Sequence, residues 1–531
     1  MNGPIPYSGV FKALIPECIL VVGAFAALTL DLAWMRRAES GARRRTIGFV
    51  AMVGLVAAMV ALCFQIPGTG PHEYDRLVFL GGTLVVDKLT TIFNLVIVVL
   101  TLLTVVISLD FDIGRHVGEY FATLLFGAIG MMLLISSEEL ITIFVALELT
   151  SICLYILTAF HKGELRSQEA AMKYFMFGAI SSAFLLFGLS YVYGLTGTTN
   201  LREIAKAIHP DNVSPLLAVA LLFVIVGFGF KVAVVPFHLW APDAYEGAPT
   251  PVTAFIATGS KVASFFVFLK VVMIAFSGLP GSAYHFGLSA TWRGGVIDWL
   301  RQLGESFHAN LYFASGWVML LAVIAAASMI LGNCVAIVQH NIKRLLAYSS
   351  IAHAGYILIG FCAATNTGAT SVLFYIIVYA LTNLGAFGVV AALADKAGGD
   401  DLENFDGMAR KAPFLSLLML IFILSLAGIP PLGGFFGKFY LFAAAVDRDA
   451  KTFGLLWLVV LGIFMSAVSL YYYLILLKHI YVHASRDSTP ITTPTYVSVV
   501  LAVIALAVVL LGVFPEPLLA LLKPLVAHLL L

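Results

Sequence analysis

Long apolar stretches run through the whole sequence and limit the possible folds more than any other feature. A helix that crosses the hydrocarbon core of a bilayer needs about 20 mostly apolar residues. Polar residues, glycines and prolines divide the sequence into fourteen such stretches, numbered here as spans one to fourteen: 16–35, 46–64, 88–109, 119–136, 139–160, 170–194, 214–240, 251–276, 312–336, 344–364, 370–394, 413–446, 453–478 and 494–513. Their apolar runs lack the two-residue alternation of barrel strands. We therefore predict an all-α polytopic membrane protein.

The amino-acid composition agrees with burial in lipid. Apolar residues make up 61% of the chain and charged residues only 11%, whereas soluble globular proteins contain about 25% charged residues. Most soluble enzymes are therefore excluded. The 30 Lys and Arg nearly balance the 29 Asp and Glu, so the basic excess typical of a nucleic-acid-binding protein is absent.

The cysteines and the first residues indicate little chemistry. Each cysteine lies singly in an apolar stretch, without a C-x-x-C pair or a Cys/His pair at metal spacing, so we expect small core residues. They are Cys18, Cys63, Cys153, Cys334 and Cys362. We expect no metal site and no cofactor in this chain. Because the N-terminus lacks the basic region and cleavage site of a signal peptide, we expect span one to be retained.

The basic residues indicate an orientation in the membrane. Short cytoplasmic loops are enriched in Lys and Arg, and the loop after span one contains Arg36, Arg37, Arg43, Arg44 and Arg45. Placing this loop inside puts both termini on the outer, periplasmic side. Asp31 lies at the end of span one, and we expect it to pair with these arginines.

Two spans contain prolines that should interrupt them. Pro236 lies late in span seven, and span twelve contains the sequence GIPPLGG. Proline removes a backbone donor and clashes with the preceding turn, so unpaired backbone groups must face protein or water there.

Interrupted helices five spans apart suggest two copies of a five-helix unit, spans four to eight and nine to thirteen, as in many transporters. We therefore expect an N-terminal three-span segment at 1–110, the two repeats at 111–276 and 312–480, an external loop at 277–311 and a C-terminal span in 481–531.

Four lysines fall within the spans: Lys231, Lys261, Lys270 and Lys438. A lysine at mid-bilayer costs about 2.5–3.5 kcal/mol, and burial disfavours its charged form, so it can take up and release a proton. Lys231 and Lys438 lie beside the interruptions, and Lys261 lies near the middle of span eight. Lys270 lies near the end of span eight and is expected to extend its ammonium group to the interface.

Further titratable side chains accompany these lysines. Glu148 is the one acid clearly at mid-depth, and we expect it to interact with a lysine as one titrating unit. His238 follows Lys231 by seven residues, two turns along an unbroken helix, and suits a proton relay. The alternative is structural: buried ion pairs would hold helices together, and His238 would be hydrogen-bonded in a polar hinge.

Secondary candidates lie in spans ten and eleven. His353 and Tyr379 are possible members of a polar pathway, and Lys343, next to Arg344 at the inner mouth of span ten, is a candidate for proton uptake. Each has a structural alternative: helix-packing polar residues for His353 and Tyr379, and an orientation anchor for Lys343.

Four segments resemble the antiporter-like membrane subunits of respiratory complex I. They are AAMKYFMFGAISSAFLLFG (Ala170–Gly188), FKVAVVPFHLWAPDAYEGAPTPVTAFIATGSKVASF (Phe230–Phe265), KRLLAYSSIAHAGY (Lys343–Tyr356) and LAGIPPLGGFFGKFYLF (Leu426–Phe442). The first two are similar to the chain N branch of the bacterial enzyme. Chain M carries a glutamate where Lys438 stands, and chain L continues into a long lateral helix that this sequence lacks after Val513.

The resemblance implies fourteen helices, two inverted repeats and a proton pathway along the middle of the membrane. Glu148, Lys231, Lys261 and Lys438 match the family's glutamate and lysines of spans five, seven, eight and twelve, and His238 matches its histidine after the break in span seven. It implies a proton-translocating subunit of NADH:quinone oxidoreductase in the bacterial inner membrane, with other membrane subunits as partners. NADH, FMN, iron–sulfur clusters and quinone would belong to partner chains.

Other functions stay open at this point. The same broken-helix unit serves in stand-alone cation/proton antiporters, and a photosynthetic, ferredoxin-linked complex contains a very similar chain. A quinone-binding redox protein and a passive scaffold are further alternatives. No dinucleotide-binding fingerprint or cysteine cluster favours redox chemistry in this chain.

Overall fold

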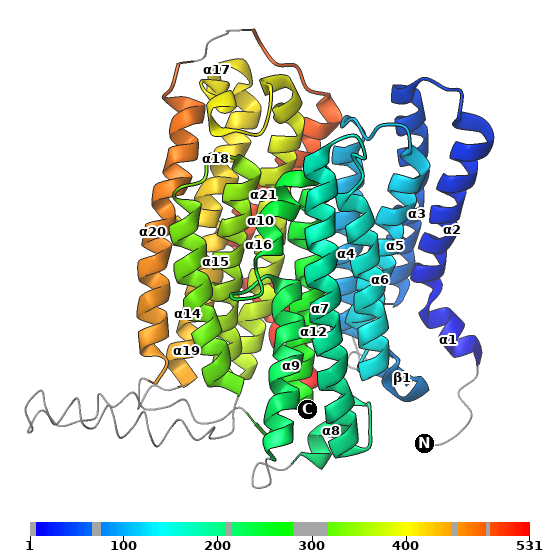
Figure 1. Ribbon diagram of the computed structural model, residues 1–531, viewed down its shortest axis with the longest axis vertical. Coiled ribbons are helices and arrows are strands. Elements are labelled where there is room, and N and C mark those ends of the chain that lie inside the picture. The colour runs from blue at the N-terminus through cyan, green and yellow to red at the C-terminus, as the bar shows by residue number, and fades with distance from the viewer. Residues whose placement is uncertain are drawn as a thin grey trace, which may run out of the picture.

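A computed structural model describes residues 7–65, 76–208, 214–279, 317–448, 454–484 and 489–530. Most of the predicted external loop, 277–311, lies outside these residues, as does the start of span nine. The described chain is a bundle of long, roughly parallel helices with short connections at its two ends (Figure 1). Helix α1 and the C-terminal end of the chain lie at one end of the bundle, and α17 lies at the other end (Figure 1).

The helices of the bundle follow the apolar stretches closely. In chain order the first half consists of α1 (Tyr7–Ala13), α2 (Ile15–Leu30), η1 (Asp31–Met35), α3 (Ser40–Gln65), α4 (Lys88–Ser108), α5 (Val117–Ser136), α6 (Leu140–Thr158), α7 (Leu165–Thr196), α8 (Leu201–Ala207), α9 (Pro215–Val232), α10 (Trp240–Gly247), α11 (Thr250–Phe255), η4 (Ile256–Ser260), α12 (Lys261–Lys270) and η5 (Val271–Ala275). The strands β1 (Leu77–Phe79) and β2 (Leu84–Val86), joined by η2 (Leu80–Gly82), form a small hairpin before α4.

The second half consists of α14 (Trp317–Ala336), α15 (Ile342–Ala363), α16 (Asn366–Ala397), η6 (Leu402–Phe405), α17 (Met408–Lys411), α18 (Pro413–Ala427), α19 (Gly433–Arg448), α20 (Leu456–Tyr481), α21 (Thr495–Val513) and α22 (Glu516–Leu530). The described residues contain thirteen helices long and apolar enough to cross a membrane. The pair α18 and α19 supplies the remaining predicted span in two pieces. The prediction of about fourteen spans is thus confirmed.

Both predicted interruptions are present. Helix α9 ends at Val232, Ala233 takes a left-handed conformation (φ 59°), and α10 begins only at Trp240. Helix α18 ends at Ala427, where Gly428 takes φ 85°, and α19 begins at Gly433. A positive φ removes the residue from the helical region, so the last carbonyl groups of α9 and α18 lose their partners within the helix.

The pieces of span twelve are packed too closely for a side chain at Gly434. Its amide donates to Ser425 Oγ (3.1 Å), and an added Cβ would lie 1.9 Å from the Ser425 carbonyl oxygen. Glycine therefore allows α19 to start directly against the end of α18.

Span eight is less regular than an apolar stretch indicates. It is made of α11, the π-helical turn η4, α12 and the π-helical turn η5. Lys261 directly follows the first π turn, and Lys270 directly precedes the second. Such turns often occur at functional sites because they redirect side chains. The residues of this span are almost all buried, so it forms the centre of the bundle together with α15 and α16.

The outer helices expose apolar side chains such as Phe25, Phe49 and Phe187. A membrane accounts for this exposure, because lipid covers apolar faces that water would not tolerate. Three of the five cysteines lie on exposed faces: Cys18, Cys63 and Cys334. The prediction that all five are core residues was therefore wrong for these three. An apolar stretch does not distinguish a lipid-facing position from a core position.

Each half of the described chain contains one isolated backbone bridge. Before α6, Glu139 pairs with Asn200, which caps α8 after the 32-residue α7. Before α15, Asn341 pairs with Asp401, which follows the 32-residue α16. The two bridges lie at opposite ends of the bundle, since α8 and α17 mark opposite ends (Figure 1).

Predicted pairing of Asp31 with the first loop is confirmed. The Asp31 carboxylate accepts two hydrogen bonds from the Arg43 guanidinium, one of them 2.6 Å long, and a third from the Gly118 amide (2.9 Å). A bidentate pair of this kind fixes geometry as well as charge.

Lys270 does not extend to an interface as expected. Its side chain is fully buried, and its Nζ donates to the carbonyl oxygens of Ile135 (3.0 Å) and Ser137 (2.9 Å) at the end of α5. It also lies 3.6 Å from Oε1 of Glu138, which is fully buried too. A structural role for Lys270 stays a prediction. Its physical basis would be a buried ion pair with Glu138, because the side chain does not reach an interface.

Glu138 is the centre of a charged cluster that we did not predict. Besides Lys270, Arg76 contacts its Oε2, and Arg202 Nε lies 3.3 Å from the same atom. Burial alone would raise the pKa of Glu138, but Lys270, Arg76 and Arg202 together keep this pKa below its ordinary value of 4.5. Its carboxylate is therefore charged at neutral pH and ties α12 to the loops at one end of the bundle.

We expect the substitution Glu138→Ala to lower the free energy of unfolding of the full chain by about 3–5 kcal/mol, because it leaves the buried Lys270 without its counter-charge. The native carboxylate has a lowered pKa, so its contribution is present above pH 4.5 and is lost as the pH falls through the folded-state pKa. Thermal unfolding in detergent at several pH values measures both effects.

Glu203→Ala is the matched control, because Glu203 lies at the same end of the bundle but is exposed. A surface change of this kind alters stability by about 0.5 kcal/mol or less. Equal losses in the two variants would contradict a structural role for the Glu138 cluster.

Candidate functional site

The three lysines predicted at mid-bilayer are all buried in the bundle. Lys231, Lys261 and Lys438 expose less than a tenth of their surface. No ion pair within 4.0 Å involves any of the three in the described parts of the chain. Their ammonium groups are instead bound by hydroxyl groups, carbonyl oxygens and aromatic faces.

Lys438 lies at the interruption between α18 and α19. Its Nζ donates to the carbonyl oxygens of Leu426 (3.0 Å) and Ala427 (3.2 Å) and to Ser466 Oγ (2.9 Å). It also lies 4.9 Å from the centre of the Tyr356 ring. The last carbonyls of a helix are unpaired and form the negative end of its dipole. The helix break thus solvates an ammonium group inside the bundle.

Lys261 binds to the middle of α15. Its Nζ donates to the carbonyl oxygen of Ser350 (3.1 Å) and to the Ser350 hydroxyl. The Tyr245 hydroxyl lies 3.4 Å from the same serine Oγ, and the centre of the Tyr379 ring lies 5.9 Å from Nζ. The Tyr379 hydroxyl is buried and has no hydrogen-bond partner among the described residues. The secondary candidate Tyr379 thus lies beside Lys261.

A hydrogen-bonded chain of side chains starts beside Ser350. The adjacent Ser349 hydroxyl contacts the Tyr473 hydroxyl, which lies 3.1 Å from Nε2 of His353. The other ring nitrogen of His353 contacts the Tyr375 hydroxyl. All of these groups are buried. The secondary candidate His353 is therefore the centre of a network from three helices, α15, α16 and α20.

The same region continues toward Lys438. The Tyr356 hydroxyl accepts a hydrogen bond from Asn333 Nδ2 (3.1 Å), and the Tyr472 hydroxyl donates to Asn333 Oδ1 (3.0 Å). Because the Tyr356 ring faces Lys438, this second polar group lies beside Lys438 as the first lies beside Lys261. Hydroxyl and imidazole groups can each accept one proton and donate another.

Glu148 and Lys231 lie on neighbouring helices without direct contact. Ser182 donates to Oε1 of the half-buried Glu148, and Nζ of Lys231 contacts the Ser151 hydroxyl. Glu148 and Ser151 are three residues apart on α6, so they share one face of that helix. Glu148 and Lys231 therefore form no ion pair within 4.0 Å in this arrangement, and serine hydroxyls bind each of them separately.

His238 does not lie two turns beyond Lys231 on one helix face. The predicted interruption of span seven explains this, because α9 ends at Val232 and His238 falls in the turn before α10. Its ring is buried, and Nδ1 has no hydrogen-bond partner among the described residues. The neighbouring Val235 amide donates to Ser328 Oγ (3.0 Å) of α14, so this turn reaches the second half of the protein.

Lys343 lies beside a cavity of about 310 Å³ that also borders Asp400 and Glu246. Its Nζ lies 2.8 Å from Asp400 Oδ2 and donates to the Ala248 carbonyl oxygen (3.2 Å). The side chain is buried, which differs from an ordinary surface anchor. The pairing of Asp400 with Lys343 was not predicted, because the two residues are 57 positions apart in the sequence and no local pattern joins them.

Arg344 forms ion pairs instead of extending to lipid headgroups. Its Nη1 lies 2.6 Å from Asp243 and 2.9 Å from Glu246, and Lys173 lies 2.8 Å from Asp243. Burial would raise the pKa of Asp243, but hydrogen bonds from Lys173 and Arg344 lower it below its ordinary value. These pairs join α7, α10 and α15.

Comparisons with known proteins agree with this geometry. The family described as NADH:quinone oxidoreductase/Mrp antiporter, TM, matches residues 137–292 and 306–468. A relative from Acidobacterium capsulatum named NADH-quinone oxidoreductase subunit N 2 is 43% identical, over 97% of this chain and 98% of its own. A Nostoc relative named NAD(P)H-quinone oxidoreductase subunit 2 is 37% identical, over 97% of this chain and 92% of its own.

A chain of respiratory complex I from Thermus thermophilus has the same fold. It aligns with a TM-score of 0.73 and 31% identity, covering 95% of this chain and 98% of the other. The similarity thus extends over nearly the full length of both chains. The family model covers both sets of helices that carry the buried lysines. The chain therefore belongs to the NADH:quinone oxidoreductase/Mrp antiporter family of membrane subunits, and its relatives group it with the N subunits of complex I.

Proposed function

We propose that this chain moves protons through the membrane part of a complex I-type NADH:quinone oxidoreductase, using Glu148, Lys231, Lys261 and Lys438 as a relay. Relatives bearing the N subunit name and the Thermus complex support the assignment to such an assembly. Other membrane subunits of that enzyme, including neighbouring antiporter-like chains, are the partners. NADH, FMN, iron–sulfur clusters and quinone are assigned to partner subunits.

The observation that carries the proposal is the buried polar line between Lys261 and Lys438. Lys261 can pass a proton to Ser350. Ser349, Tyr473, His353 and Tyr375 form the next hydrogen-bonded chain. We assign the steps from Ser350 to Ser349 and from Tyr375 to Lys438 to water. Each hydroxyl or imidazole can receive a proton on one atom as it releases one from another. A structural polar cluster would not need two uncompensated lysines at its ends.

In the first half, the separation between Glu148 and Lys231 would control whether Lys231 holds a proton. A negative charge beside a buried lysine favours the protonated form of the lysine. Motion of Glu148 toward Lys231 would therefore protonate Lys231, and separation of the two would release the proton. Ser182 and Ser151 bind the two groups in the separated state. We assign the transfer from Lys231 to Lys261 to water, since no hydrogen bond joins their clusters in the described chain. His238, with its free buried Nδ1, is available near this step.

Uptake and release follow the proposed orientation. The cavity beside Lys343 lies next to the bridge of Asn341, at the end opposite the C-terminus, which makes it the candidate for cytoplasmic proton uptake. Release is proposed to the outer, periplasmic side of the bacterial inner membrane, the side on which both termini would lie. Arginines after α2 support this orientation through the enrichment of basic residues inside.

The proposed inverted repeats at 111–276 and 312–480 gain support from the two backbone bridges. Leu140 N donates to Thr199 O (2.9 Å) in the first half, and Ile342 N donates to Asp400 O (2.8 Å) in the second. Each bridge joins the start of one helix to the chain after the next 32-residue helix. Their position at opposite ends of the bundle agrees with one repeat being inverted relative to the other.

The equivalent subunit of a photosynthetic complex stays the second candidate. A Nostoc relative at 37% identity is named NAD(P)H-quinone oxidoreductase subunit 2, so not every relative bears the N subunit name. Copurification in mild detergent distinguishes the candidates: NADH-oxidising partner chains favour the respiratory complex, ferredoxin-binding chains favour the photosynthetic one, and isolation without redox partners favours a stand-alone antiporter.

We expect Lys231→Ala, Lys261→Ala and Lys438→Ala to slow proton translocation at least about tenfold in the assembled enzyme, since a positioned acid–base group contributes this much or more to proton transfer. Proton uptake per electron in proteoliposomes measures the effect. Lys261→Arg and Lys438→Arg test the chemistry further. Arginine keeps the charge but does not release its proton, so pumping should stay low in these variants.

Rescue of pumping by arginine would indicate a structural cation and contradict the relay. Lys206→Ala is the matched control, because Lys206 is an exposed lysine on α8. Its pumping should equal that of the unmodified enzyme.

Tyr473→Phe tests the line between Lys261 and Lys438 separately. The substitution removes the hydroxyl that joins Ser349 to His353 but keeps the ring in the core. We expect proton translocation to fall severalfold while the assembled complex keeps its composition and NADH-dehydrogenase activity. Tyr193→Phe, at an exposed tyrosine of α7, is the control. Unchanged pumping in Tyr473→Phe would exclude this route.

A further inference from the structure

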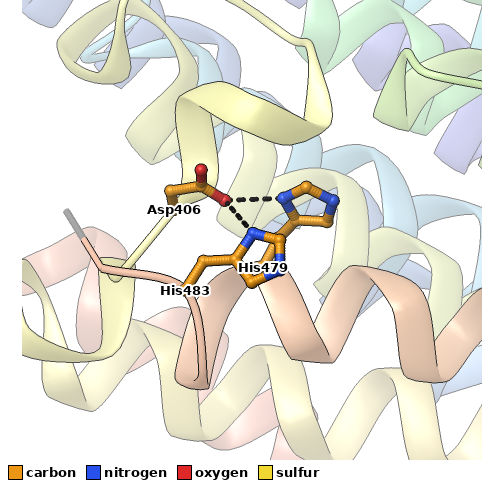
Figure 2. A group of neighbouring side chains, drawn as sticks. All are labelled: Asp406, His479 and His483. Carbon is orange, nitrogen blue, oxygen red and sulfur yellow. Dashed lines mark hydrogen bonds and ion pairs between the residues drawn. The ribbon is translucent and has the colours of Figure 1, made fainter. Parts of the chain in front are cut away.

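Three metal-ligating side chains meet away from the buried lysines. Asp406 lies between η6 and α17, His479 lies in the last turn of α20, and His483 follows that helix. Figure 2 shows both imidazole rings turned toward one carboxylate oxygen. Nδ1 of His479 lies 2.6 Å and Nδ1 of His483 lies 3.1 Å from Asp406 Oδ1. The three ligand atoms lie within 4.8 Å of one another.

Backbone contacts fix the segments that carry these side chains. The Gly407 amide donates to the His479 carbonyl oxygen (2.9 Å), which ties the Asp406 segment to α20. The His483 amide donates to the Lys478 carbonyl oxygen (3.1 Å) and so continues the last turn of that helix. The ring centroids of His479 and His483 lie 4.4 Å apart. Backbone hydrogen bonds thus hold the segments that carry the three side chains next to each other.

The donor set suits a divalent metal ion. Zinc binds imidazole nitrogen and carboxylate oxygen at about 2.0–2.2 Å, usually in tetrahedral geometry, which places ligand atoms about 3.3–3.5 Å apart. The observed contacts of 2.6 and 3.1 Å need to lengthen only slightly when an ion replaces the shared protons. Two histidines and one carboxylate leave the fourth position to water.

The surroundings allow an ion to reach the cluster. The side chains of His479, His483 and Asp406 are 16%, 34% and 27% exposed, so they are neither free in solvent nor closed off. Both histidines lie at the C-terminal end of α20, where the helix dipole favours a positive charge. Among the divalent ions that bind such ligands, zinc and its neighbours in the first transition row are favoured over calcium and magnesium.

We propose that Asp406, His479 and His483 form a binding site for a divalent transition-metal ion, zinc by preference. No cysteine takes part, and Asp406 is 73 residues from His479 in the chain. The sequence expectation of no metal site considered cysteine clusters and short Cys/His spacings, so it did not weigh this arrangement. The site is independent of the proposed proton relay, and either can fail without the other.

Zinc competition against a chromophoric chelator tests the site. The full chain is purified in detergent, its affinity tag is removed, and metal is stripped with EDTA before titration. We expect one zinc per chain, and at least tenfold weaker binding in His479→Gln, in His483→Gln and in Asp406→Asn, because each loses a direct ligand. Asparagine in place of Asp406 keeps an acceptor for the histidines but removes the charge.

Cobalt(II) provides a second measurement that does not depend on activity. A tetrahedral nitrogen and oxygen site should give intense visible absorption with the wild-type chain, and the variants should lose it. His116→Gln is the matched control, because His116 is an exposed histidine 3.1 Å from the carboxylate of Glu119. It should bind zinc like the wild type. Gel filtration checks that each variant is folded.

Two results would overturn the proposal. One is a wild-type chain that binds no more zinc than the triple variant Asp406→Asn, His479→Gln, His483→Gln. The other is equal weakening by His116→Gln and His479→Gln. In either case the cluster would be a hydrogen-bonded contact between α20 and the Asp406 segment only.

Discussion

The structure depends on how a bundle of apolar helices stabilises buried ammonium groups. A lysine at mid-bilayer is costly, and neighbouring acids are scarce here. Helix interruptions supply the missing solvation, because they free carbonyl oxygens inside the protein. Lys438 binds the two last carbonyls of α18, and Lys270 binds carbonyls at the end of α5. The same geometric device thus serves a proposed relay lysine and a lysine in an ion-pair cluster.

The difference between these two lysines is the counter-charge. Lys270 faces Glu138, so its charge is compensated. Lys261 and Lys438 face hydroxyls, carbonyls and aromatic rings, which bind an ammonium group but also tolerate a neutral amine. An uncompensated lysine can therefore change its charge at small cost. This physical difference separates the structural site from the proposed functional one.

The spans, their interruptions and the buried lysines could be predicted from the sequence, since charge within an apolar stretch is visible without a structure. Contacts between distant segments could not. Glu138 stands in the three-residue connection between α5 and α6, and nothing local links it to Arg76, Arg202 or Lys270. The interruption near Pro236 could be predicted, but nothing local shows that a left-handed Ala233 ends α9 three residues before it. Asp406 and His479 meet only because the chain folds back over the end of α20.

Helix α20 contributes at three depths: Ser466 binds Lys438, Tyr473 joins Ser349 to His353, and His479 contacts Asp406. Consecutive residues of a helix differ by 1.5 Å along its axis. A displacement of α20 by that single step would change the geometry of all three contacts at once. One helix therefore relates the position of the Asp406 segment to that of the polar side chains around His353 and Lys438.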